Sequence, residues 1–423
     1  MSFIHQMKNY TVLFILFFLS ILIIIFSTGF LSFNRNSLIL NISITENQIF
    51  IKGIQPTIIT PTFYLHSPYV EILDFILYKH PTSTDEYSIY FSGRRHSWTW
   101  SDIYCFFTNS NESVHGSIDR RSEEPFVLCP LPSFAQKLLF NGNSQLNLSL
   151  RIHDKSFPNT SLLLSNITVP IYHRNRYNVS IYTMICNRTE VLVEWIEYHL
   201  LIGVEHFYLY DHFSTDNLNY FLRSYLERQL VTIIRWPYRP LKGHYWNMMQ
   251  SASMNHALKT FGSFNRWMGY FDVDEYFQIT DPTKLLNHTI SLSDFLDQNF
   301  PESTYPGGVQ FRNCPISCLF DEVGIASSRY RLLFEKCRHI HSEQDCQSRT
   351  KMFIRPRHVP IMQNIHALEH GIQFASSSQS SSLAQFRHYH YGVMLITMSE
   401  NDTIDRSMDI FIDELKKRII SYL

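Results

Sequence analysis

Strands and helices alternate from about residue 177 onward, and this alternation constrains the fold more than any other sequence feature. β-Branched and aromatic runs predict strands, and apolar residues at helical spacing between them predict helices. Parallel strands need such helical crossovers, so the pattern predicts an α/β fold with a mostly parallel, doubly wound sheet in residues 171–423. The expected strands cover 177–186, 205–212, 230–236 and 266–277, and the expected helices cover 189–203, 215–229 and 247–262.

The preceding residues, 34–170, differ in composition, with β-branched runs broken by Pro, Asn and Ser. Such runs are typical of strands and turns, so we expect a small β-rich accessory domain or a structured stem. Asn141-Gly142 lies between two apolar runs and predicts a β-hairpin. At the other end of the chain, residues 404–423 predict an amphipathic helix that packs back on the domain.

An uncharged run of 23 residues lies near the N-terminus, at 11–33. A helix of that length spans the ~30 Å hydrocarbon core of a bilayer. It is longer than the roughly 7–15 apolar residues of a signal peptide, although cleavage near 27–32 is the alternative. Lys8 and Arg35 flank the run and orient it weakly. With so short a tail, the sequence predicts a signal anchor that leaves residues 1–10 in the cytosol and the rest in the lumen.

Asn-x-Ser/Thr sequons support a luminal orientation. All nine lie beyond the predicted span, at Asn41, Asn111, Asn147, Asn159, Asn166, Asn178, Asn187, Asn287 and Asn401. Their crowding favours the secretory lumen over the cytosol, since N-glycosylation acceptors lie on the surface of secreted proteins.

The chain has seven cysteines, an odd number that leaves one unpaired within a monomer. Proximity along the chain favours two luminal disulfides, Cys105 with Cys129 and Cys337 with Cys346.

Three cysteines remain after these pairs. Cys314-x-x-x-Cys318 is also compatible with a zinc half-site, but no second half-site of suitable spacing accompanies it. Cys186 ends an apolar strand and is expected to be a buried free thiol.

Three carboxylates end the fourth predicted strand, in "WMGYFDVDEYFQI" (267–279). In an ideal strand Asp272 and Asp274 face the same side, while Glu275 points away or terminates the strand. Ligands of open α/β sheets bind at the carboxyl ends of the strands, and carboxylates suit Mg²⁺ or Mn²⁺. Such an ion can neutralise a nucleotide diphosphate leaving group. The alternative is a pair of solvated turn residues, because Asp-x-Asp is short and recurs by chance.

Four segments in the same order resemble glycosyltransferase family 92, whose members are Golgi type II membrane enzymes with a GT-A (Rossmann-like) fold. The resemblance covers roughly residues 177–392. The segments are "CNRTEVLVEWIEYHLLIGVEHFYLYDHFSTDN" (186–217), "RWMGYFDVDEYF" (266–277), "SRTKMFIRPRHVPIMQNIHAL" (348–368) and "RHYHYG" (387–392).

The resemblance implies a nucleotide-sugar donor, most often UDP-galactose, and transfer with inversion to a glycan acceptor. It also implies a divalent metal, Mn²⁺ or Mg²⁺. Asp272 and Asp274 match the family's metal-binding Asp-x-Asp. His366 is the expected third ligand, with His388 as its rival.

The donor contacts come from several segments. Asp211 matches the family's Tyr-Asp after the second strand, and Asp272 is shared with the metal site. Lys351, Arg355 and Arg357 are expected to face the diphosphate, because guanidinium forks bind such oxygens in pairs. The alternative for this basic cluster is a solvated surface.

An inverting transfer needs one general base, usually Asp or Glu, to take the proton of the acceptor hydroxyl. The candidates are Asp321, Glu322 and Glu335, which the sequence does not rank and which also fit surface positions.

Aromatic and acidic residues elsewhere have weaker signals. Trp195, Trp236 and Trp246 include candidates for a sugar-stacking platform, although core packing is the default for a tryptophan. Glu194 and Glu197 are expected on the solvent face of a helix.

The net charge of -1 and the pI near 7.0 exclude a nucleic-acid footprint. The expected partners are the donor, the glycan acceptor and the membrane, and the sequence is compatible with a homodimer. Two other functions stay open: a membrane-anchored, glycan-binding pseudoenzyme of the same fold, and a metal-dependent hydrolase. The intact Asp272/Asp274 pair argues against the first, and the lack of a His-rich two-metal motif argues against the second.

Overall fold

The described part of the chain comprises many segments. The computed structural model describes residues 42–43, 58–59, 65–66, 70–79, 87–95, 103–107, 112–119, 126–140, 145–154, 161–170, 176–236, 246–319, 332–340, 346, 349–368, 372–389, 395–396 and 403–420. The predicted membrane span at 11–33 lies outside them. Within these segments, no helix combines the length and the apolar character needed to cross a membrane.

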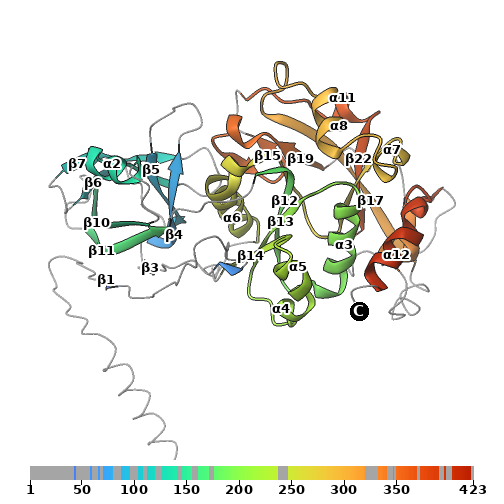
Figure 1. Ribbon diagram of the computed structural model, residues 1–423, viewed down its shortest axis with the longest axis horizontal. Helices are drawn as coiled ribbons and strands as arrows, with labels where there is room; N and C mark the ends of the chain where they lie inside the picture. The colour runs from blue at the N-terminus through green and yellow to red at the C-terminus, as the bar shows by residue number, and fades with distance from the viewer. Residues whose placement is uncertain are drawn as a thin grey trace, which may run out of the picture.

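Among its described residues, the segment expected to be β-rich contains two five-stranded sheets and one helix (Figure 1). One sheet has the order β1-β11-β10-β6-β7, and the other has the order β3-β4-β5-β9-β8. Their strands are β1 (Ile42–Ser43), β3 (Leu65–His66), β4 (Val70–Lys79), β5 (Tyr87–Arg95), β6 (Ile103–Phe107), β7 (Glu112–His115), β8 (Ser117–Asp119), β9 (Phe126–Pro130), β10 (Gln145–Asp154) and β11 (Ser161–Pro170).

The hairpin predicted at Asn141-Gly142 is wrong. The apolar run before it forms helix α2 (Ser133–Phe140), so this segment connects a helix to β10. Apolar residues of α2 also satisfy a helical spacing, and a short run does not distinguish the two periods.

The alternating part of the chain forms one half of a large mixed sheet. Strands β15 (Asn265–Tyr270), β12 (Tyr177–Ile185), β13 (His206–Asp211), β14 (Val231–Arg235) and β2 (Ile58–Ile59) lie side by side in that order, and all are parallel. We call this group the parallel half. The order reverses at β12, since β13 and β15 flank it. Such a switch point is where open α/β sheets bind ligands.

The crossovers of the parallel half are helices. They are α3 (Thr189–Leu201), α4 (Leu218–Phe221), α5 (Arg223–Glu227) and α6 (Trp246–Phe261). α3 lies on the side that also carries the C-terminal helix α12 (Ile412–Ile420), which contacts it (Figure 1). The predicted packing of an amphipathic C-terminal helix on the domain is therefore confirmed. α6 lies on the other side and also contacts β4 and β5.

The other half of the sheet departs from the prediction of mostly parallel strands. β19 (Thr350–Ile354) is antiparallel to both β15 and β17 (Gly308–Leu319). β22 (Ala384–Tyr389) runs parallel to β17 and antiparallel to β16 (Glu275–Ile279). We call these four strands the mixed half. Sequence alternation could not reveal it, because antiparallel pairing between strands that are distant in the chain leaves no local pattern.

Shorter elements surround the mixed half. They are α7 (Thr283–Leu286), α8 (Leu292–Asn299), α10 (Leu333–Lys336), β18 (Cys337–Ile340), β20 (Met362–Asn364), β21 (Ala367–Leu368), α11 (Ser377–Ser380), β23 (Leu395–Ile396) and β24 (Thr403–Ile404).

Burial corrects the expectation for α3. Glu197 is buried, not solvated, and accepts a hydrogen bond of 2.7 Å from the Tyr225 hydroxyl. Glu194 accepts hydrogen bonds from the backbone N–H of Leu333 at 2.9 Å and from the Tyr276 hydroxyl at 3.3 Å. Both acids lie on faces of α3 that the rest of the domain covers, which helical spacing alone did not reveal.

The disulfides were predicted only in part. Cys105–Cys129 forms as expected. Cys346 pairs with Cys314 and not with Cys337, so the second predicted disulfide is wrong. Cys337 is also disulfide-bonded. Sequence proximity failed because the strand pairing, not the chain separation, brings cysteines together.

The remaining cysteine predictions follow from this pairing. A zinc half-site at Cys314 is excluded, since its sulfur is in a disulfide. Cys186 is the free thiol among the described cysteines, as predicted. It lies just beyond β12 and is half-buried, where full burial was expected.

Candidate functional site

The fourth predicted strand is interrupted where the carboxylates lie. β15 ends at Tyr270 and β16 begins at Glu275, with a turn between them. The Glu275 N–H donates to the Asp272 carbonyl at 3.1 Å, and the Asp272 N–H donates to Glu275 Oε2 at 2.8 Å. Asp272 and Asp274 therefore enter the site from a turn held at both ends by hydrogen bonds, and not from one face of a strand.

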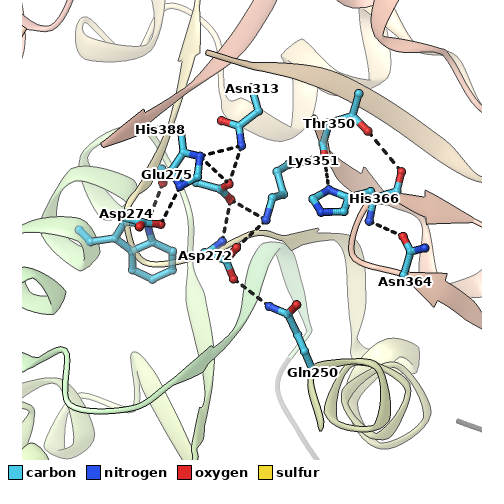
Figure 2. Close-up of polar contacts among 11 residues, drawn as sticks. Gln250, Asp272, Asp274, Glu275, Asn313, Thr350, Lys351, Asn364, His366 and His388 are labelled. Atoms are coloured by element: carbon cyan, nitrogen blue, oxygen red, sulfur yellow. Dashed lines mark hydrogen bonds and ion pairs between the residues drawn. The ribbon is translucent and has the colours of Figure 1, made fainter. Parts of the chain in front are cut away.

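Glu275 points into the protein below this turn, contrary to the expectation that it would point away. Its side chain is 0% exposed. Glu275 Oε1 accepts a hydrogen bond of 2.5 Å from Asn313 Nδ2, and Oε2 lies 3.1 Å from Lys351 Nζ (Figure 2). Burial raises the pKa of Glu275 above its usual value, while Lys351 opposes this effect.

Asp272 shares the Lys351 ammonium. Its Oδ2 accepts a hydrogen bond of 2.6 Å from Lys351 Nζ, and its Oδ1 accepts one of 2.8 Å from Gln250 Nε2. Burial would raise the pKa of Asp272, but Lys351 outweighs burial and lowers it. Burial would likewise lower the pKa of Lys351, but Asp272 and Glu275 raise it overall. The pair is therefore ionised at neutral pH.

Asp274 faces a histidine of the mixed half. Its Oδ1 lies 3.5 Å from His388 Nε2, and its backbone carbonyl accepts a hydrogen bond of 2.8 Å from the Tyr389 N–H. His388 Nδ1 lies 3.8 Å from Glu275 Oε1. Burial lowers the pKa of His388, but the carboxylates of Asp274 and Glu275 outweigh it and raise the pKa overall. Both ring nitrogens of His388 are thus directed at acids.

His366 has the opposite electrostatic setting. Its Nδ1 lies 2.6 Å from the Thr350 carbonyl oxygen, which only accepts, so Nδ1 carries the hydrogen and Nε2 keeps its lone pair. Burial, followed by the charge of Lys351, lowers the pKa of His366. A neutral imidazole fixed in this tautomer by a carbonyl is the usual form of a metal-binding histidine.

These side chains line one cavity of about 530 Å³ at the carboxyl end of the parallel half. The parallel half contributes the turn with Asp272 and Asp274, and the mixed half contributes Lys351 and His388. The other residues that line the cavity are Met184, Cys186, Arg188, Trp246, Asn247, Gln250, Val273, Glu275, Arg349, Ile365 and His366.

The three tryptophans considered for a sugar-stacking platform differ in how exposed they are. Trp195 and Trp236 are fully buried, whereas Trp246 is 41% exposed and lines the cavity. Its ring contacts His212 edge-on, with centroids 5.5 Å apart. Trp246 is therefore the one of the three that presents an open aromatic surface to a ligand.

Three of the expected donor contacts, Asp211, Arg355 and Arg357, lie outside the cavity lining. Asp211 accepts a hydrogen bond of 3.0 Å from the Ser214 N–H and pairs with Arg235. Arg355 is 1% exposed, stacks over Trp267 at 3.8 Å and ion-pairs with Asp297 at 3.0 Å.

The remaining donors of Arg355 are also occupied. It donates to the carbonyl oxygens of Tyr305 at 2.7 Å and Phe300 at 2.6 Å. The expectation that Arg355 faces the diphosphate is thus corrected, because its guanidinium is already bound within the core. Arg357 pairs with Glu302 at the surface, which is the alternative stated for this cluster.

Glu335 is the predicted base candidate that lies within the described residues, and it does not line the cavity. Glu335 accepts hydrogen bonds from the Leu332 N–H at 2.8 Å and from Lys416 Nζ at 2.6 Å. These contacts cap helix α10 and tie it to α12, so the contacts of Glu335 in this structure are structural ones. Asp321 and Glu322 lie outside the described residues.

Gln250 and Asn313 were not predicted. Each lies among other polar residues of its element, Gln250 beside Ser251 in α6 and Asn313 beside Arg312 in β17, so the local sequence carried no signal for them. Their role depends on contacts with Asp272, 22 residues away, and with Glu275, 38 residues away. Sequence pattern could not supply these pairings.

The chain was compared with known proteins. A family model described as glycosyltransferase family 92 matches residues 176–420. Glycosyltransferase family 92 proteins from Ricinus communis and Oryza sativa subsp. japonica are 32% and 30% identical over 108 and 106 residues, covering 25% of this chain and 17% of each relative. Galactan beta-1,4-galactosyltransferase GALS2 from Arabidopsis thaliana is 26% identical over 202 residues, covering 47% of this chain and 36% of the relative.

The alignments thus cover well under half the length of these relatives. A solved structure of S. aureus TarS has 12% identity and a TM-score of 0.25, covering 58% of this chain and 65% of that one, which is too low to support an argument about fold. The family assignment rests on the match over residues 176–420, which is more than half of the chain and contains the whole cavity. The chain belongs to glycosyltransferase family 92.

Proposed function

We propose that this chain is an inverting glycosyltransferase that transfers a sugar from a nucleotide-sugar donor to a glycan acceptor. The observation that carries the proposal is the Asp272–Asp274 turn, which lies at the carboxyl end of β15, beside the switch point, in a cavity of about 530 Å³. The galactosyltransferase name of the Arabidopsis relative supports galactose as the sugar and UDP-galactose as the donor.

A divalent metal, Mn²⁺ or Mg²⁺, is part of this proposal. The donor set fits such an ion in its chemistry, because Asp272 and Asp274 offer carboxylate oxygens and His366 offers a neutral nitrogen. His366 fits better than His388, whose two nitrogens are directed at Asp274 and Glu275. Within the described ranges, no three His, Cys, Asp or Glu side chains are already grouped around one point. When bound, the ion would neutralise the diphosphate of the leaving group.

Other residues of the cavity suit the donor. Arg188 and Arg349 line it, and a guanidinium fork binds phosphate oxygens in pairs. Trp246 offers a flat surface for a ring of the donor or the acceptor. Asp321 and Glu322 remain candidates for the base that takes the acceptor proton.

We further propose the cellular setting expected from the sequence. The run 11–33 would anchor the chain in the Golgi membrane as a single-pass type II protein, with its sequons and its catalytic domain in the lumen. A homodimer is compatible with this arrangement.

The proposal is tested by assaying the full chain, purified in detergent, for release of nucleoside diphosphate from a panel of nucleotide sugars, with and without Mn²⁺. Turnover of at least one donor is expected, and Asp274→Ala should lower it by at least about 100-fold. Asp281→Ala, which removes an exposed acid seven positions away, is the matched control and should keep full activity.

Two results would contradict the proposal. Equal activity of Asp274→Ala and the wild type would show that the turn is not the reaction centre. Donor binding without turnover of any donor, in the presence of oligosaccharide acceptors, would favour the glycan-binding pseudoenzyme.

A further inference from the structure

Lys351 is the buried cation of the site, and its position is unusual for a residue expected to bind phosphate. Its side chain is 3% exposed, and Nζ lies 2.6 Å from Asp272 Oδ2 and 3.1 Å from Glu275 Oε2 (Figure 2). An ammonium has three hydrogens, so two of them are already directed at carboxylates. Lys351 therefore pairs with the carboxylates of Asp272 and Glu275, which leaves one hydrogen of its ammonium for a donor.

The charge balance of the turn depends on the contact of Lys351 with Asp272 and Glu275. Three carboxylates lie at the turn, those of Asp272, Asp274 and Glu275, and Lys351 cancels one of them. Glu275 has no access to solvent and cannot be neutralised by bulk ions. Without Lys351, the turn would hold one more uncompensated negative charge in a buried setting, which costs several kcal/mol or attracts a cation.

The contact also occupies an oxygen that a metal would need. Asp272 Oδ2 accepts from Lys351 and Asp272 Oδ1 accepts from Gln250, so both of its oxygens are engaged by protein donors. A divalent ion would share Asp272 with a fixed positive charge close to it, and that repulsion weakens ion binding. By contrast, the carboxylate of Asp274 lies 3.5 Å from His388 Nε2 and is not shared with Lys351.

We propose that Lys351 is a built-in counter-ion of the Asp-x-Asp turn that keeps the affinity of the site for a bare divalent cation low. It is a positioning residue, since it acts through Asp272 and Glu275. The diphosphate of the donor supplies the negative charge that restores affinity, so that metal and donor bind together. This inference rests on the proposed function, because it presupposes a metal-dependent nucleotide-sugar donor.

The test measures Mn²⁺ binding to the full chain by paramagnetic resonance of the free ion, with no nucleotide present. Lys351→Met should bind Mn²⁺ at least about tenfold more tightly than the wild type, because two carboxylates lose their cation. Lys351→Arg should bind like the wild type. Lys284→Met removes a lysine that is exposed at the surface and is the matched control.

A second variant keeps the test valid if Lys351→Met does not fold. Glu275→Gln leaves Lys351 with one carboxylate, so its charge acts more fully on Asp272, and Mn²⁺ should bind more weakly than in the wild type. Unchanged or weaker binding in a folded Lys351→Met, or tighter binding in Glu275→Gln, overturns the inference.

The failure of the proposed function would look different. In that case the wild type would bind no Mn²⁺ even with UDP present, and it would turn over no nucleotide sugar. The inference alone fails if the wild type is active and the two Lys351 variants bind Mn²⁺ equally.

Discussion

The two halves of the large sheet differ in how they are built and in what they give to the site. In the parallel half, regular helices connect β12, β13, β14 and β15, and the half supplies the turn with Asp272 and Asp274. In the mixed half, β17, β19 and β22 pair with strands that are distant in the chain and supply residues that hold that turn in place. Asp272 and Asp274 thus come from the turn that follows the parallel half, whereas Glu275, Asn313, Lys351 and His388 come from the mixed half.

This division explains why neither half could form the site alone. Three carboxylates in a short turn would repel one another, and one of them, Glu275, is fully buried. Asn313 on β17, Lys351 on β19 and His388 on β22 compensate for that repulsion (Figure 2). The site is therefore a contact between halves, and the predictions below test that contact from its strongest part to its weakest.

The largest effect is expected when Glu275, which contacts both the turn and the mixed half, is replaced. Glu275→Ala should lower the free energy of unfolding by about 3–5 kcal/mol, because it leaves the Asn313 amide without its buried partner and leaves Lys351 with Asp272 as its remaining carboxylate. Urea denaturation checks this. Glu275→Gln keeps the shape and should cost less than Glu275→Ala; equal losses would mean that charge, and not shape, joins the halves.

The next prediction tests whether Arg355 stabilises the fold or binds the donor. Arg355→Met should lower the free energy of unfolding by about 3 kcal/mol, because Asp297 loses its partner and two carbonyl oxygens lose a donor. The KM for the donor should stay within about twofold. A large rise in KM with unchanged stability would restore the donor contact expected from the sequence.

The same division explains what the sequence could predict. Local alternation predicted the strands and helices of the parallel half, and position at a strand end singled out Asp272 and Asp274. These features depend on neighbours along the chain. The break in the strand at 271–274 was missed because apolar and acidic residues alternate through it, which also fits a strand, and because one hydrogen bond that makes the turn involves the side chain of Glu275.

The mixed half was largely beyond prediction. Lys351 was singled out as a basic residue, but its partners are 79 and 76 residues away, so its role as a counter-ion could not be inferred. Gln250 and Asn313 were missed for the same reason. Arg355 and Glu335 were misjudged because charge in a sequence does not reveal which charges are already paired in the core.

A smaller effect is expected at the rim of the cavity, on the side of the parallel half. Trp246→Ala should raise the KM of the donor or the acceptor by about tenfold, because an aromatic surface contributes on the order of 1–3 kcal/mol to stacking. Stability should change little, since the ring is 41% exposed. Tyr220→Ala removes an exposed ring that does not line the cavity and is the matched control. Equal KM values for both variants would exclude Trp246 from the binding surface.

The weakest expected effect concerns pH at a second contact between the halves. Burial raises the pKa of Glu194 on α3 to about 8, where it meets Leu333 and Tyr276. A raised pKa means that the folded state holds the proton more tightly, so stability is greatest below pH 4.5 and falls as the pH rises toward 8. Glu194→Gln should reduce this fall by about 1–2 kcal/mol in thermal or urea unfolding between pH 5 and 8. Identical pH profiles of the two proteins would mean that Glu194 is already ionised in the folded state, with its charge balanced by the N–H of Leu333.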